Sequence, residues 1–137
     1  MSYPNWYKKH LKTIQQSYSK TPFFEDYYPL INNAYIACSK MTKISDINQY
    51  LVIALAKIIG IDTKFERAEC FQLPDERNAR LLSLCEQLNA TNYVSAPAAK
   101  VYLNEKIFME KGISVDWFEY PKYKKYSQIT SNFEHAV

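Results

Sequence analysis

Apolar residues recur three or four positions apart through much of the chain, which is the spacing of one face of a helix. Tyr7, Leu11, Ile14 and Tyr18 show this spacing most clearly. Helices are predicted over approximately residues 5–19, 22–38, 45–59 and 76–88, and another is predicted from about residue 98. The amino-terminal half of the chain is therefore expected to be helical.

Proline and glycine residues indicate where these predicted helices begin, bend or end. Pro22 suits the first position of the second helix, with Thr21 as its cap. The aromatic residues that follow recur at helical spacing, which favours a place in the core over a stacking platform. Pro29 lies inside the same helix and has no backbone donor, so a kink or a break is expected near Tyr28. Gly60 supplies the left-handed residue that ends the third helix.

Three short segments have the composition or the alternation of β-strands, and they cover residues 61–67, 92–95 and 113–118. Because helices separate these segments along the chain, their connections suit parallel strands joined by right-handed crossovers. The expected fold class is α/β, with a short parallel sheet flanked by helices.

Composition narrows the class of protein. The chain has 137 residues and 47% hydrophobic content, which describe a single domain over residues 1–137. Cys38, Cys70 and Cys85 form no C-x-x-C pair, so free thiols in a reducing cytoplasm are expected and no metal is assigned. No stretch reaches the roughly 18 apolar residues of a membrane span. Two glycines are too few for a P-loop or a G-x-G-x-x-G loop, and the cofactor stays unknown.

Charge does not favour nucleic acid as a partner. Residues 120–126 interleave aromatic and basic side chains as base-stacking surfaces do, but they also suit an exposed edge. The net charge of +3 is modest and no known docking motif is present, so nucleic-acid binding is not favoured. Lys8, Lys9 and His10 crowd the start of the first helix, either as an anion-binding patch or as a solvated face.

Residues 91–103 carry the strongest local indication of a site, because a predicted strand ends there in a polar turn. Ser95 would lie at the carboxyl end of a central strand, and Lys100 one turn into the next helix, both facing one crevice. Arg67 or Glu69 would reach that crevice from the end of the preceding strand. The alternative is a plain strand-to-helix connection with a solvated lysine.

Several motifs follow one another in a characteristic order. They occupy residues 6–14, 22–24, 45–48, 60–65, 80–82, 88–90, 93–97, 100–103 and 112–115. In this order they resemble the WbqC-like family, which is found with bacterial surface-polysaccharide and O-antigen biosynthesis genes. The resemblance runs from residue 5 to about residue 133. Family members are longer and open with a strand and a His-Gln-Pro motif, so this chain resembles their carboxyl-terminal part.

The chain departs from the family pattern at three places. Ala96 stands where glycine is usual, Asn104 where an acidic residue is usual, and residues 121–123 replace a His-Pro pair. Glycine admits a closer backbone approach, and a histidine or a carboxylate can move protons. These changes therefore count against an intact site.

The pattern and the resemblance together imply a Rossmann-like three-layer fold, as a partial version of a longer family domain that lacks a strand or two at one edge. An exposed sheet edge invites pairing, so a homodimer or a partner chain is expected.

The resemblance implies a cytoplasmic transferase-type enzyme, or its remnant, that acts on an activated sugar or an aminoacyl-type precursor. His10 and Glu69 are the catalytic candidates, as groups that move a proton. The residues expected to bind an anionic substrate of nucleotide or sugar-phosphate type are Lys8, Lys9, Arg67, Arg80, Ser95, Lys100 and Tyr102. The alternative is a non-catalytic binding or assembly module that needs a partner chain, and absence of the His-Gln-Pro half favours it.

Overall fold

The structure, a computed structural model, describes residues 5–119, 121 and 126–129. The chain forms two compact units, Met1–Phe65 and Glu66–Val137. Most of the aromatic and basic segment at residues 120–126 lies outside the described residues. The expectation of one domain over residues 1–137 stays a prediction.

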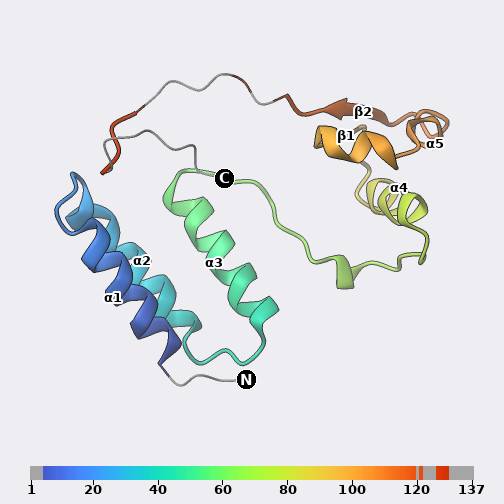
Figure 1. The fold of residues 1–137 in the computed structure, drawn as a ribbon. Helices are drawn as coiled ribbons and strands as arrows, with labels where there is room; N and C mark the ends of the chain where they lie inside the picture. Colours follow the sequence, from blue (N-terminus) through green and yellow to red (C-terminus); the bar gives the residue numbers. More distant parts are fainter. Residues whose placement is uncertain (1–4, 120, 122–125, 130–137) are drawn as a thin grey trace. The chain divides into compact units, whose positions relative to one another are not determined.

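The first unit is helical, as its apolar spacing predicts. It contains α1 (Trp6–Tyr18), α2 (Phe24–Cys38) and α3 (Ile44–Ile58), and α2 packs against both of the others (Figure 1). Small and aliphatic side chains form its buried contacts, namely Leu11, Ala34, Cys38, Ile47 and Ala56. Small residues such as Ala34 and Ala56 allow the helices to approach closely.

The start of α2 differs from the prediction. The helix begins at Phe24, and Phe23 before it has a left-handed backbone, with φ of 65°. Pro22 is therefore in the preceding turn and not in the first helical position. The helix also continues without a break through Pro29, because that residue is exposed and the carbonyl that loses its donor can meet water.

The second unit mixes short helices with a small sheet. Its elements in chain order are η1 (Ala68–Cys70), α4 (Arg77–Gln87), β1 (Asn92–Ser95), η2 (Pro97–Val101), α5 (Glu105–Met109) and β2 (Ser114–Trp117). β1 and β2 pair in parallel, with Asn92 beside Ser114 and Ser95 beside Trp117. The parallel sheet expected between residues 92 and 118 is thus confirmed, and the fold class is mixed α/β.

One face of this sheet covers the core of the second unit. Tyr93, Val115 and Trp117 pack on a buried cluster formed by Cys85, Leu103, Phe108 and Ile113. Within that core the Tyr93 and Phe108 rings stack at 5.3 Å between centroids. The residues of the opposite face, among them Val94 and Asp116, are exposed. The described residues therefore cover one face of the sheet, and a three-layer Rossmann-like arrangement is not confirmed.

Two predicted elements are wrong. Residues 61–67, all described, form no strand, and among the described residues the sheet has two strands. No strand of the described residues pairs with this segment, and the N–H of Ile61 instead donates to the Ala56 carbonyl at the end of α3. The helix expected from about residue 98 is divided into η2 and α5. The first ends at Val101, followed by Tyr102, and Asn104 caps the second by accepting the N–H of Lys106 at 3.2 Å.

The prediction for Gly60 is confirmed. Gly60 has φ of 79°, and the N–H of Ile61 donates to the Ala56 carbonyl at 2.8 Å, which closes the last turn of α3. Asn89 and Gly112, with φ of 52° and 72°, follow the ends of α4 and α5 in the same way. Among the described residues, no helix has the length and apolar character to cross a membrane.

Candidate functional site

The carboxyl ends of β1 and β2 lie side by side in the second unit. Ser95 and Trp117 are paired neighbours there, and the N–H of Phe118 donates to the Ser95 carbonyl at 2.8 Å. Both side chains are half-buried on the core side of the sheet. Ligands of parallel α/β sheets bind outside this edge, so the edge is where a site is sought.

Lys100 reaches the same edge from η2. Its ammonium nitrogen lies 5.2 Å from the centroid of the Trp117 ring. Within the described part of the chain no carboxylate pairs with this lysine, and the residue is exposed. An exposed cation–π contact is worth about 0.5–1 kcal/mol. An anion that binds the Lys100 ammonium at this edge would therefore disrupt only its weak contact with the Trp117 ring.

Tyr102 is held by the first turn of α4. The guanidinium carbon of Arg77 lies 4.5 Å from the centroid of the Tyr102 ring. The Asn78 side chain donates to the Tyr102 carbonyl at 3.2 Å and accepts the N–H of Asn104 at 2.9 Å. One amide thus binds the backbone on both sides of Leu103, which is buried in the core. This connection fixes the segment that carries Lys100 and Tyr102.

Arg77, Asn78 and Trp117 were not among the residues predicted for the site. Asn78 contacts residues 24 and 26 positions away, and no spacing pattern reports such a contact. Trp117 had a signal, since it lies at the end of the predicted last strand. In a parallel sheet that end meets the end of β1.

The other polar residues predicted for the second unit make local contacts. Arg67 pairs with Glu69, with 2.7 Å between Nε and Oε1. Arg80 donates to the Pro74 carbonyl at 3.0 Å and lies 3.6 Å from a carboxylate oxygen of Asp75. The expectation that Arg67 or Glu69 reaches the crevice from a strand end is wrong, because residues 61–67 form no strand.

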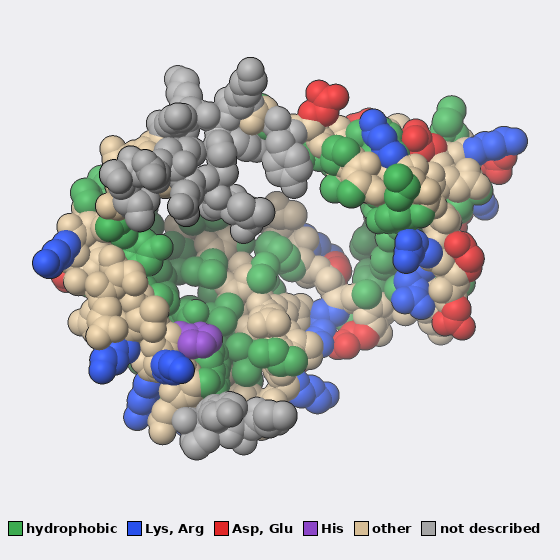
Figure 2. Space-filling model, viewed as in Figure 1, with side chains coloured by type: hydrophobic (Ala, Val, Ile, Leu, Met, Phe, Trp, Pro, Cys, Tyr) green, Lys and Arg blue, Asp and Glu red, His purple; other side chains and the backbone are tan. Residues whose placement is uncertain are grey.

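Lys8, Lys9 and His10 belong to the first unit, where all three are exposed on α1. Basic side chains lie beside the histidine on the face shown in Figure 2. The His10 ring packs 5.4 Å from Trp6 and 5.9 Å from Tyr35 between centroids, in edge-on contacts. The His10 ring therefore contacts an aromatic ring of α1 and another of α2.

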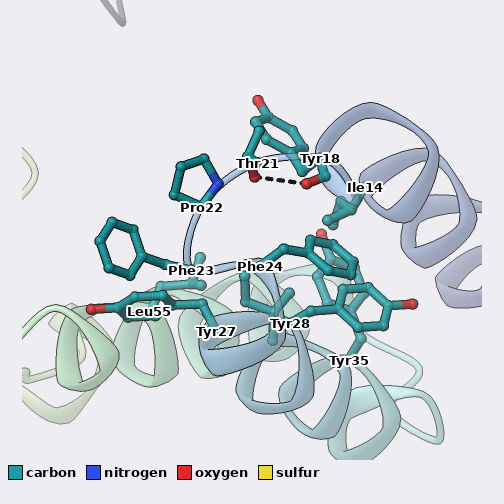
Figure 3. A pocket seen from close by; sticks show the side chains of 11 residues that line it. Ile14, Tyr18, Thr21, Pro22, Phe23, Phe24, Tyr27, Tyr28, Tyr35 and Leu55 are labelled. Carbon is teal, nitrogen blue, oxygen red and sulfur yellow. Dashed lines mark hydrogen bonds between the residues drawn. The ribbon is translucent and has the colours of Figure 1, made fainter. Parts of the chain in front are cut away.

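A pocket of about 330 Å³ lies in the first unit, among α1, α2, α3 and the turn before α2 (Figure 3). Its lining residues are Ile14, Tyr18, Thr21, Pro22, Phe23, Phe24, Tyr27, Tyr28, Ile31, Tyr35 and Leu55. The aromatic residues after Pro22 thus line a hollow instead of filling a core. The sequence showed their helical spacing but not the hollow, because the position of α3 is a tertiary property.

Thiol chemistry and metal binding find little support in the described residues. Burial raises the pKa of the Cys38 and Cys85 thiols, which disfavours their reactive thiolate forms. Cys70 is exposed. No three His, Cys, Asp or Glu side chains in the described ranges lie close enough to hold a metal ion together.

Comparison with known proteins links the chain to one family. A family model described as "WbqC-like protein family" matches residues 1–137. The uncharacterized protein Rv1507c of Mycobacterium tuberculosis is 34% identical over 133 residues, which are 97% of this chain and 57% of that protein. The chain thus spans little more than half the length of this relative. No solved structure matches the chain.

Proposed function

The chain belongs to the WbqC-like protein family, and from this premise we propose that it acts in surface-polysaccharide (O-antigen) biosynthesis in the cytoplasm. The proposed role is that of a transferase-type enzyme, or its remnant, for an activated sugar or aminoacyl-type precursor. The ligand is an anionic compound of nucleotide or sugar-phosphate type. The site for its anionic group is the carboxyl end of β1 and β2.

The observation that carries this proposal is the position of Lys100 over Trp117, beside the strand end at Ser95. A lysine without a carboxylate partner in the described residues is available to a phosphate or carboxylate, and the Ser95 hydroxyl can orient the bound group. Tyr102, which Arg77 stacks against, would contact the less polar part of the same ligand.

The remaining predicted residues have weaker support. Arg67 and Arg80 already contact Glu69 and Asp75, so an anion would compete with carboxylates for them. Lys8 and Lys9 stay as proposed contacts on α1. The proton-transfer roles of His10 and Glu69 also stay proposals.

A longer family domain is consistent with the length comparison, and we propose that this chain is its carboxyl-terminal part. It covers 57% of its mycobacterial relative. In a complete domain, further strands would extend the edges of the β1–β2 pair, and helices would cover the exposed face that carries Val94 and Asp116. That addition would complete a Rossmann-like three-layer fold.

Thermal-shift measurements with UDP-glucose, ATP and inorganic pyrophosphate test the proposed ligand class. A ligand that binds only the folded state at about one hundred times its Kd stabilises it by roughly 2.7 kcal/mol. We expect a rise in Tm with at least one of these anions. Lys100→Met should abolish the rise, and Lys106→Met, which alters another exposed lysine of the second unit, should keep it. No shift with any anion, or an equal shift in Lys100→Met, would contradict the proposal.

A second candidate function is a non-catalytic binding or assembly module that works with a partner chain or as a homodimer. It is favoured by exposed apolar side chains in the second unit, including Val101 at 88% and Met109 at 70% exposure. Light scattering across a concentration series tests it. A mass that rises to that of a dimer supports self-association, whereas a constant monomer mass counts against it.

A further inference from the structure

The pocket in the first unit is built from aromatic side chains at helical spacing. Six of its lining residues are aromatic, namely Tyr18, Phe23, Phe24, Tyr27, Tyr28 and Tyr35. Figure 3 shows Pro22 and Phe23 on one side of the pocket, and Ile14, Phe24 and Tyr35 on the other. The Phe24 and Tyr28 rings stack at 4.7 Å between centroids, with 20° between their planes. The walls therefore offer flat aromatic surfaces.

Among the residues that the structure describes, no Asp, Glu, Lys, Arg or His side chain lines this pocket. Its polar groups are hydroxyls, from Thr21 and from tyrosines. The Thr21 hydroxyl already donates to the Tyr18 carbonyl at 2.6 Å. Burial raises the pKa of Tyr35, so its phenol stays uncharged at neutral pH. A charged ligand would lose water here without gaining an opposite charge, so the lining favours an uncharged ligand.

The volume limits how much of a ligand the pocket can enclose. A cavity of about 150 Å³ can hold benzene, and this pocket has about 330 Å³. A compound with two fused rings therefore suits it better than a single ring. Aromatic pairs also contribute about 0.5–1.5 kcal/mol beyond the area that they bury, which favours a planar aromatic compound over an aliphatic chain.

The backbone at Phe23 is a second observation at the same place. Its φ of 65° is costly for a bulky residue, and its side chain is 71% exposed, so burial of the ring does not offset the cost. Strained residues of this kind occur at ligand clamps. Here the strained turn places an exposed aromatic ring at the side of an aromatic pocket.

From the lining, the volume and the strained turn, we propose that this pocket binds an uncharged planar aromatic compound of about two fused rings. The pocket is a site separate from the Lys100 edge, since all of its lining residues belong to the first unit. A tyrosine hydroxyl would accept a hydrogen bond from a polar atom on the ligand ring or donate one to it.

Titration of the whole chain with indole, followed by protein NMR, tests this proposal. We expect saturable shifts in the amide signals of Phe23 and Leu55. Indole-3-acetate, which adds a carboxylate, should bind much more weakly, because the described lining of the pocket contains no cation. The flexible apolar compound n-octanol should also bind more weakly than indole.

Two matched variants locate the binding. Tyr27 and Tyr50 are helical tyrosines with 47% and 37% exposure, and only Tyr27 lines the pocket. Tyr27→Ala should weaken indole binding about tenfold by removing an aromatic wall, whereas Tyr50→Ala should leave it unchanged. Leu55→Phe should block the pocket. Absent or non-saturable shifts, equal affinities of Tyr27→Ala and wild type, or tighter binding of indole-3-acetate or n-octanol would overturn the proposal. Such a failure would leave the Lys100 proposal unaffected.

Discussion

Phe23 has a left-handed backbone conformation, which is unfavourable for a residue with a large side chain. A left-handed backbone costs a residue with a large side chain about 1–2 kcal/mol. The sequence predicted a regular helix start at this position, because Pro22 is a good first helical residue. The left-handed conformation was not predictable, since it depends on how the turn between α1 and α2 closes. By contrast, Gly60 was predictable, because glycine carries no penalty there.

Two substitutions at Phe23 separate its backbone strain from its ring. Phe23→Asn should raise the free energy of unfolding by about 1 kcal/mol, because asparagine tolerates the left-handed conformation. Phe23→Leu keeps a strained backbone and should show no such gain. Both lose the aromatic ring, so both should bind indole more weakly. Urea unfolding and indole titration measure these effects, and equal stabilities of the Asn and Leu variants would refute the strain argument.

Helices were the most predictable elements of this chain, because their apolar spacing is a local property. Residues 5–19 and 76–88 contain α1 and α4 nearly at the predicted limits. Strands were less predictable, because a strand needs a partner. Residues 92–95 form a strand that pairs with β2, whereas residues 61–67 form no strand.

The start of α4 predicts a pH dependence of stability. The backbone N–H of Ala79 donates to a Glu76 carboxylate oxygen at 2.6 Å, and this bond and the Asn78 backbone N–H lower the pKa of Glu76. Since the folded pKa lies below the unfolded value, the stabilisation is present above the unfolded pKa. It is lost as the pH falls through the folded pKa.

Glu76→Gln tests this cap. The amide keeps an acceptor but loses the charge, so the variant should be less stable than wild type at pH 7. The difference should vanish at a pH below the lowered pKa. Urea unfolding at both pH values measures it, with Glu119→Gln as a control at an exposed residue outside the caps. A difference that is the same at both pH values would argue against the charge as its cause.

At the scale of the whole molecule, the boundary between the two units falls in the irregular segment at residues 61–67. Exposed segments outside helices and strands open locally at little cost and are cleaved first. Among sites in the described residues, trypsin should therefore cut first after Lys64 or Arg67. Mass spectrometry of short digests identifies the products. A first cut within α1, after Lys8 or Lys9, would contradict this division of the chain.

The candidate site was predictable in part at this scale. The sequence placed Ser95 at a strand end and Lys100 shortly after it, and both are at the carboxyl edge of the sheet. It indicated the strand end at Trp117 but not the contact of Lys100 with the Trp117 ring, because that contact depends on how η2 packs beside the sheet. It also misplaced Arg67 and Glu69, because their strand does not form.

The proposed anion site has a built-in reporter, because Trp117 is one of two tryptophans and Lys100 lies over its ring. In a Trp6→Phe background, tryptophan emission comes from Trp117 alone. Titration with pyrophosphate or UDP-glucose at constant ionic strength should change this emission saturably, as the ligand draws the ammonium away. The change should disappear with Lys100→Met and persist with Lys106→Met. Emission that stays constant with both ligands, or responds equally without Lys100, would contradict the account of this site.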